Sequence, residues 1–355
     1  MRALYLIFLF AFISGSLFAQ PHSSTYPNGQ IKDEGRLKNG QKEGTWIHWS
    51  EDGHKQYEYQ YHKGKKHGQY TRWYPSGQVA EQSTYSGGRK SGNHMIFQKD
   101  GSIHVQGKYK NGLREGAWTF HSEEKVEIGE FNHGEKEGPW LGLTPDSLVS
   151  DSGAFHHGRK NGEWHYHNYV EHLLTVGHFD EGKKVGNWTS WYENGTKASE
   201  SHYEGGFLHG RYTEWYSNGN KKVEGKTEYG APIGTKTTWY KNGAKHEEFH
   251  YQKFWDTHGC NPCAKENGIF FSWYDNGRLA IQGHYKFGLK DGYWVYYYPN
   301  GNKEKEENWK VKETQDNALR DYKITKHGRF SFYNKKEELQ KVENYEEDTL
   351  VTLQE

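Results

Sequence analysis

Positively charged residues recur at one position of a repeated sequence pattern, two residues after the first glycine of each loop. They are Lys42, Lys66, Lys90, Arg114, Lys136, Lys160, Lys184 and Lys290. If successive units stack in register, two strands per unit space these cations roughly 9 to 10 Å apart along one edge. Such an edge would bind anionic groups, for example lipid or lipopolysaccharide phosphates. The alternative is solubilising charge on exposed turns, and carboxylates such as Glu43 and Glu115 dilute the positive field.

Tryptophans form a second recurring set, five residues after the glycine that opens a strand. They are Trp49, Trp73, Trp191, Trp215, Trp239 and Trp273. Indole rings exposed on a sheet would stack on sugar rings, so this row is a candidate glycan-binding or cell-wall-binding surface. If the rings are buried against their neighbours, this hypothesis fails.

Cys260 and Cys263 form a CxxC motif, with His258 two residues before it. One CxxC supplies two zinc ligands, and even with His258 a fourth ligand is missing. A thioredoxin-like redox motif would sit in a βαβ unit, which the surrounding sequence does not provide. In an oxidising compartment we expect a local disulfide between the two cysteines, and neither a metal nor a cofactor.

The remaining chemistry-bearing residues show no catalytic pattern. The 22 histidines are scattered, and the chain has no HExxH motif, nucleophile elbow, phosphate-binding loop or spaced carboxylate pair. The 46 lysines and arginines balance 46 aspartates and glutamates, so the chain lacks the positive field that nucleic-acid binding requires. We therefore predict a protein that is not an enzyme and does not bind nucleic acid.

Aromatic residues and glycines determine the expected fold class. The 14 Trp, 27 Tyr and 17 Phe supply half of the 32% hydrophobic residues, and 43 glycines accompany them. These residues favour strands and tight turns over helices. Disordered chains are poor in aromatic residues, so the composition indicates a folded all-β protein.

The glycines that open each Gly-x-aromatic element recur with one period, and eight of their eleven intervals are 24 residues long. They are Gly44, Gly68, Gly92, Gly116, Gly138, Gly162, Gly186, Gly210, Gly234, Gly268, Gly292 and Gly328. A fixed period of this length indicates a repeat array. Pairs such as Asn194-Gly195 mark another turn in each unit, for which we predict the two-residue type I′ hairpin turn. Each repeat is then two strands and two turns.

Aromatic residues flank each glycine-bounded loop symmetrically. If the hairpin closes regularly, Phe179 and Trp188 are directly opposed on its two strands. The same spacing pairs Tyr61 with Tyr70, Tyr109 with Trp118, Phe131 with Trp140, Phe155 with Trp164, Tyr203 with Tyr212, and Tyr285 with Trp294. We expect these pairs to form an aromatic ladder in place of an aliphatic core. Strand alternation puts Trp191 on the opposite face from Trp188, unless a bulge intervenes.

The repeated unit resembles the MORN-variant repeat of bacterial proteins grouped with YwqK-type antitoxins. The resemblance lies in Tyr192-Glu-Asn-Gly195-Thr-Lys197, followed by Tyr203-Glu-Gly-Gly206-Phe-Leu-His-Gly210-Arg-Tyr212, and it covers the chain from about Tyr26 to Tyr333. It implies an elongated array of antiparallel β-hairpins, about 12 repeats of 24 residues, that serves as a binding or scaffolding surface. It does not imply an enzyme.

Three segments are expected along the chain. Residues 1–19 have a short positive start, an apolar run and small residues before Gln20, as in an export signal that is removed. Residues 20–334 form the array, with insertions near 252–267 and 304–327. Residues 335–355 are acidic and depart from the pattern, which is consistent with a C-terminal cap over the last sheet edge.

Two functions remain open at this point. The first is a noncatalytic, exported repeat scaffold that binds an unidentified protein partner at the cell envelope. The second is a glycan, cell-wall or anionic-lipid binding module that uses the tryptophan row or the cationic column. In both cases the export signal predicts an extracytoplasmic location, which is periplasmic, at the cell surface or secreted.

Overall fold

The computed structural model describes residues 18–254, 263–316 and 319–354. Every regular element in these residues is a β-strand, as the composition predicts. The described residues therefore contain no helix that is long and apolar enough to cross a membrane. Most of the expected export signal and Cys260 lie outside the described residues, as does the side chain of Cys263, so neither the signal nor the disulfide is described. The chain divides into two units, residues 1–159 and 160–355.

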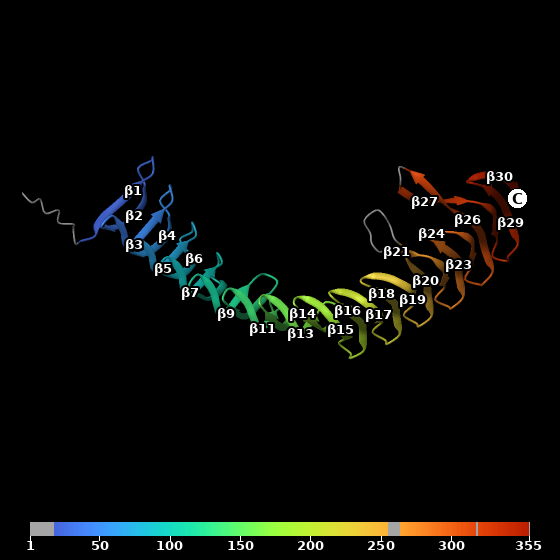
Figure 1. The fold of residues 1–355 in the computed structure, drawn as a ribbon, viewed down its shortest axis with the longest axis horizontal. Coiled ribbons are helices and arrows are strands. Elements are labelled where there is room, and N and C mark those ends of the chain that lie inside the picture. Colours follow the sequence, from blue (N-terminus) through green and yellow to red (C-terminus); the bar gives the residue numbers. More distant parts are fainter. Residues whose placement is uncertain (1–17, 255–262, 317–318, 355) are drawn as a thin grey trace, which may run out of the picture. The chain divides into compact units, whose positions relative to one another are not determined.

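The first unit is a meander in which each strand pairs antiparallel with the strand before it and the strand after it (Figure 1). Its strands are β1 (Gln20–Thr25), β2 (Ile31–Lys38), β3 (Gln41–Trp49), β4 (Lys55–His62), β5 (Lys65–Trp73), β6 (Val79–Ser86), β7 (Arg89–Phe97), β8 (Ile103–Lys110), β9 (Leu113–His121), β10 (Val126–Asn132), β11 (Glu135–Leu143) and β12 (Val149–His156).

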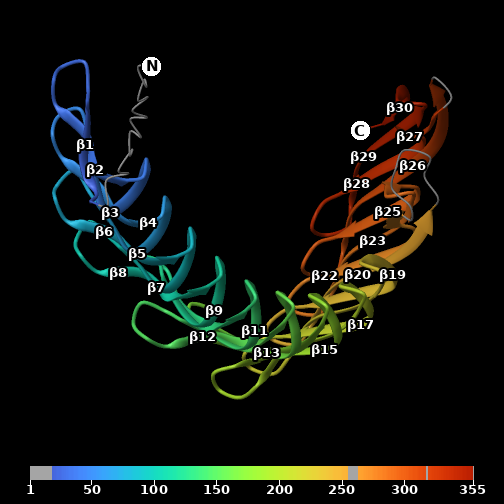
Figure 2. The same cartoon turned by 60° about the vertical axis from the view of Figure 1, so that its left-hand side comes forward.

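The second unit continues the same pattern from Arg159, at the boundary between the two units, and Figure 2 shows its strands succeeding one another in chain order. Its strands are β13 (Arg159–Asn168), β14 (Leu173–Asp180), β15 (Lys183–Tyr192), β16 (Lys197–Glu204), β17 (Phe207–Trp215), β18 (Lys221–Glu228), β19 (Ala231–Trp239), β20 (Lys245–Phe254), β21 (Cys263–Glu266), β22 (Gly268–Trp273), β23 (Leu279–Lys286), β24 (Leu289–Lys290), β25 (Gly292–Tyr297), β26 (Lys303–Asp316), β27 (Leu319–Lys326), β28 (Gly328–Tyr333), β29 (Leu339–Glu346) and β30 (Thr349–Gln354).

The described residues thus hold 30 strands, more than the roughly 24 that the period predicts. The two insertions lengthen hairpins, because β20 pairs with β21 and β26 pairs with β27. The acidic C-terminal segment adds the hairpin of β29 and β30, closed by Glu347 and Asp348, and so continues the pattern that it was expected to leave.

The turn assignment from the sequence was wrong. At the Asn-Gly column only the glycine has positive φ, as at Gly29 (φ 85°), and the loop spans Pro27 to Gly29 between Tyr26 and Gln30. This is a three-residue loop ending in a left-handed glycine. Two-residue turns with positive φ at both residues, as type I′ requires, lie at the opposite edge, for example at Lys63 (φ 50°) and Gly64 (φ 75°). We call the two edges the wide-turn edge and the tight-turn edge.

Backbone hydrogen bonds join successive repeats at the tight-turn edge. The N–H of Gly64 donates to the carbonyl of Lys42 (2.9 Å), and Gly88 donates to Lys66 in the same way (2.8 Å). In the second unit, Gly206 repeats the contact with Lys184 at 3.0 Å. Each tight turn is therefore held by the strand of the preceding repeat as well as by its own hairpin.

The expected cross-strand aromatic pairs are displaced by two residues along the first strand, so that Tyr70 is opposite Tyr59 instead of Tyr61. Phe179 is opposite Lys184, because the register shifts between Val176 and His178, beside the left-handed Gly186 (φ 64°) on the partner strand. The same shift places Tyr61 opposite Lys66. The rings still touch diagonally, since Phe179 and Trp188 lie 5.1 Å apart at an interplanar angle of 89°. The aromatic ladder is present, but its members are not directly opposed.

Candidate functional site

The tryptophans of the ladder lie flat against glycines on the neighbouring strand. Gly129 pairs with Trp140 on one side and with Trp118 on the other. A Cβ atom on Gly129 would lie 2.2 Å from the ring of Trp140, and Gly107 is covered by Trp118 in the same way. The Trp140 indole N–H donates to the carbonyl of Glu130 at 3.2 Å. These glycines stand two residues before the first ladder aromatic of their hairpins, as Gly129 does before Phe131, and this spacing is the sequence signal that marks them.

We call the sheet face that carries these rings the ladder face and the other the opposite face. In the first unit, Trp118, Phe131 and Trp140 form a buried cluster on the ladder face. Phe131 meets Trp118 at 5.8 Å and Trp140 at 5.4 Å, both edge to face. Trp118 is only 1% exposed. The ladder therefore acts as the core, as the sequence predicts.

The cationic column lies in the strands of the ladder face, so its expected position in the loops was wrong. The ammonium group of Lys42 is 3.9 Å from the centre of the Trp46 ring, Lys136 is 3.8 Å from Trp140, and Lys184 is 4.0 Å from Trp188. The other five cations, Lys66, Lys90, Arg114, Lys160 and Lys290, also lie over aromatic rings.

All eight side chains are half-buried, and burial lowers the pKa of Lys184. The cations of the column thus cover the ladder rings and contact them by cation–π interactions. The sequence alone did not predict this packing role.

The neighbouring glutamates cap tight turns. The carboxylate of Glu43 accepts the backbone N–H of Lys63 at 2.8 Å, and that hydrogen bond, followed by one from His62, lowers the pKa of Glu43. Glu137 accepts the N–H of His157 at 2.9 Å. These carboxylates therefore stabilise the backbone of the tight turns by accepting hydrogen bonds, in addition to supplying negative charge.

The tryptophan row lies on the opposite face near the wide-turn edge. Its six rings are half-buried, so they are neither fully exposed nor enclosed. A lysine of the preceding hairpin lies over several of them, for example Lys55 at 4.2 Å from Trp73 and Lys245 at 5.3 Å from Trp273. A sugar ring would have to share or displace these contacts.

One cluster in the first unit has the composition of a catalytic site. Ser83 Oγ lies 2.8 Å from His94 Nδ1 and 3.1 Å from Glu81 Oε1, and Lys90 reaches the same carboxylate at 2.8 Å. Burial, followed by repulsion from Lys90, lowers the pKa of His94 to about 4, so the imidazole is neutral at physiological pH.

The geometry of this cluster differs from that of a serine–histidine–acid triad. In a triad the imidazole bridges serine and carboxylate through its two nitrogens, whereas here the serine lies between Glu81 and His94. Ser83 is 2% and His94 is 3% exposed, so neither meets solvent or substrate. His94 occupies a ladder tryptophan position, and Ser83 occupies that of the glycine beneath it. The cluster is a polar replacement for the tryptophan and glycine.

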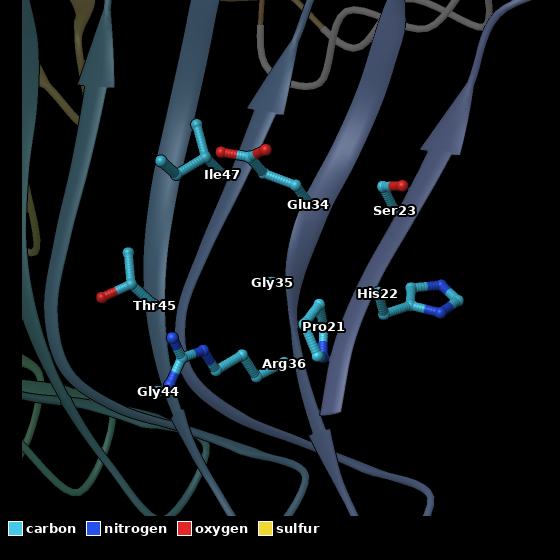
Figure 3. A pocket seen from close by; sticks show the side chains of 9 residues that line it. All are labelled: Pro21, His22, Ser23, Glu34, Gly35, Arg36, Gly44, Thr45 and Ile47. Carbon is cyan, nitrogen blue, oxygen red and sulfur yellow. The ribbon is translucent and has the colours of Figure 1, made fainter. Parts of the chain in front are cut away.

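A shallow hollow of about 690 Å³ lies over the first three strands (Figure 3). Glu34 and Ile47, which are directly opposed, lie side by side, while His22 points away from them. The labelled side chains do not converge on one point in Figure 3. Among the described residues, no group of three histidine, cysteine or carboxylate side chains is arranged to hold a metal ion.

Comparison with known proteins supports the repeat assignment. A family model described as the MORN repeat variant matches residues 66–86, 184–204, 208–228, 266–287 and 290–310. No curated protein matches the chain. A solved structure, the Photorhabdus luminescens Tc holotoxin pore with the TccC3-D651A mutation, aligns over 91% of this chain with 8% identity and a TM-score of 0.18. The chain spans only 18% of the length of that protein.

Proposed function

Because this chain is a MORN-variant repeat protein, we propose that it is a noncatalytic scaffold that presents a β surface to a protein partner at the cell envelope. The observation that supports this function is that the side chains of the ladder face are packed against one another within the chain. There the rings pack on glycines and on one another, and the cations of the column lie over the rings. The opposite face is left with exposed side chains, such as Gln69 and Thr235.

The absence of catalysis and the location are part of the proposal. The Ser83 and His94 cluster is closed to substrate, and the hollow at the first three strands is shallow and without convergent groups, which favours binding over chemistry. The extracytoplasmic location rests on residues 1–19 of the sequence. Cell fractionation would test it, and recovery of the chain in the cytosol with its first residues intact would contradict it.

Site-specific photo-crosslinking in cells tests the binding function. A photoreactive phenylalanine at Gln69 or Thr235, both exposed on the opposite face, should give covalent adducts with a distinct protein. The matched control is the same residue at Ser199, which is half-buried on the ladder face and opposite Ser190, and which should give none. Retention of the chain by peptidoglycan or anionic liposomes, together with an absence of protein adducts, would reject the proposal in favour of glycan or lipid binding.

A further inference from the structure

We propose that the opposite face of β17 and β18 binds an acidic segment of a partner protein that also carries apolar side chains. This inference rests on the proposed function and names the chemistry of the partner. It is based on exposed aromatic residues, an unbalanced pair of cations, and a change in the ladder face at the same two strands.

Two aromatic side chains are exposed together at the tight-turn edge of these strands. Phe207 is 57% and Tyr229 is 55% exposed. The rings of His209 and Tyr229 lie 4.8 Å apart, and Phe207 lies against Gly230, which follows Tyr229 in the turn. Tyr229 also has a positive φ of 49°, which a bulky residue adopts rarely and at some cost in energy. The equivalent turn residues Lys63 and Asn111 share this positive φ, so the turn does not require an aromatic residue, and the exposed ring of Tyr229 is available for binding.

Two cations lie directly opposite each other beside these rings. Arg211 pairs with Lys226 across β17 and β18, and both are exposed. Within the part of the chain that the structure describes, neither side chain forms an ion pair. Like charges that face each other across a strand pair destabilise it, and an anionic ligand would remove that repulsion.

The nearby carboxylates are already engaged. Glu228 accepts Lys253 at 2.6 Å, and Glu204 lies 3.6 Å from His209. Glu228 offsets part of this charge, because Lys253 and, more weakly, Lys226 lower its pKa. Since neither Arg211 nor Lys226 forms an ion pair with another described residue, an acidic ligand could bind both without displacing one.

The same positions in the first unit are not paired cations. The pair equivalent to Arg211 and Lys226 is Thr45 and Gln60 in one hairpin, and Asn93 and Lys108 in another. The position equivalent to Phe207 is held by Lys65 in β5 and by Leu113 in β9. The patch thus departs from the repeat at several positions of a single hairpin.

The ladder face of these strands and of β19 has lost residues that the other repeats carry there. The cationic column is interrupted by Leu208 and Pro232, and Thr227 takes the place of a ladder aromatic residue. Lys236 takes the place of a tryptophan and is directly opposite Phe249. The ladder face of β17 to β19 therefore has fewer aromatic residues and lacks two cations of the column, while the opposite face of β17 and β18 carries exposed aromatic and cationic side chains.

This combination fits a protein partner better than a sugar. Aromatic residues and arginine dominate the binding energy of protein interfaces, where a central aromatic anchor is flanked by complementary charge. An acidic segment with apolar side chains would meet Arg211 and Lys226 with its carboxylates, and Phe207 and Tyr229 with its apolar groups.

Fluorescence anisotropy with labelled peptides tests this inference on the full chain. The probes are alternating Glu-Leu, Gln-Leu and Glu-Ser peptides of equal length. We expect the Glu-Leu peptide to bind more tightly than either of the others, and we expect its binding to weaken as salt is added. The double variants Arg211→Gln/Lys226→Gln and Phe207→Ser/Tyr229→Ser should each weaken binding by about tenfold or more.

The matched control is Lys108→Gln/Leu113→Ser, which changes the equivalent positions of the first unit and should leave the affinity unchanged. Circular dichroism of each variant should match that of the parent chain. Equal binding of the parent chain and the Arg211→Gln/Lys226→Gln variant would overturn the inference, as would binding of polygalacturonate in preference to the Glu-Leu peptide. Photo-crosslinks to a protein that persist in this variant would refute the inference while leaving the proposed function standing.

Discussion

Strands β9 to β11 and strands β17 to β19 have the same backbone arrangement but carry different side chains on the ladder face. Both have tight turns with two positive φ angles and register shifts beside a left-handed glycine. In β9 to β11 the ladder face holds Trp118, Phe131 and Trp140, closed by Arg114 and Lys136. In β17 to β19 it holds Tyr212, Thr227 and Lys236 at the equivalent positions.

The comparison separates what forms the fold from what stabilises it. Tyr212 makes no ring contact among the described residues, yet β18 and β19 pair with a single register shift, as β10 and β11 do. Turn glycines and backbone hydrogen bonds are therefore sufficient to specify the meander. The aromatic ladder adds stability, and a hairpin that gives up part of it can place its aromatic residues at the surface.

The largest expected difference between the two regions is in the response to loss of a ring. Trp118→Ala should destabilise its region by about 3 to 5 kcal/mol, because it leaves a cavity in the buried cluster. Tyr212→Ala should cost roughly half as much or less, because Tyr212 is half-buried. Hydrogen exchange followed by mass spectrometry would measure each region separately. Similar losses of protection would show that the two ladders contribute equally.

Acid should loosen the Trp118 region more than β17 to β19. His94 lies 5.8 Å from Trp118, and burial lowers its folded-state pKa to about 4, below the ordinary value near 6.5. The unfolded chain then binds a proton that the folded chain does not, so stability present above pH 6.5 is lost as the pH falls towards 4, by up to about 3 kcal/mol.

The variant His94→Phe should abolish this acid sensitivity while retaining a ring at the ladder position. Exchange protection of β7 to β9 between pH 4 and pH 7 is the measurement, with β17 and β18 as the internal reference. If the parent chain and His94→Phe lost protection in parallel, His94 would not be the responsible group.

Adding a methyl group beneath a ring should distinguish the two regions more finely. Gly129→Ala would place its Cβ atom 2.2 Å from the body of the Trp140 indole, and we expect a cost of about 1 to 3 kcal/mol. At Gly225 the nearest atom is the Tyr212 hydroxyl at 2.7 Å, at the free end of a half-buried side chain, so Gly225→Ala should cost less. Urea denaturation of the two variants, read out in their own segments by hydrogen exchange, would decide the order.

The smallest expected effect has the opposite sign. Lys226→Gln removes the repulsion between Arg211 and Lys226 and should leave the chain as stable as the parent or more stable by up to about 1 kcal/mol. The matched change in the first unit, Lys108→Gln, should be neutral or slightly destabilising, because Lys108 faces Asn93 on one side and Glu115 on the other. A clear destabilisation by Lys226→Gln in thermal melts would mean that this lysine supports the fold.

The repeat array could be predicted from the sequence because its period is carried by glycines that few other residues can replace. The left-handed turns and bulges require Gly44, Gly68 and their equivalents, and the 24-residue spacing follows directly from them. The aromatic ladder was predicted for the same reason, since large rings at a fixed offset have few alternatives to packing on one another.

The side-chain partners could not be predicted because each bulge changes the register. A regular hairpin opposes Tyr61 to Tyr70, whereas the bulge at Gly68 opposes Tyr59 to Tyr70 and leaves Tyr61 opposite Lys66. That displacement carries the lysine from an expected loop position to a place over the Tyr59 ring. Asn-Gly also favours the type I′ turn in isolation, but a glycine alone is sufficient for the wide turn that forms there.

Each tight-turn glycine donates a hydrogen bond to the preceding repeat. Removing one whole period should therefore leave every such donor with an equivalent acceptor. Deleting Arg89 to Gly112, which is 24 residues, would join Gly88 to Leu113, and the Gly134 N–H would still find the carbonyl of Arg114. A deletion within a tight turn or the strands beside it would move these donors away from their acceptors, whereas the wide turn tolerates a change in length, as in the 22-residue interval between Gly116 and Gly138. We expect the shortened chain to keep the circular dichroism spectrum of its parent, so that the length of the array can change by single periods without a change of fold.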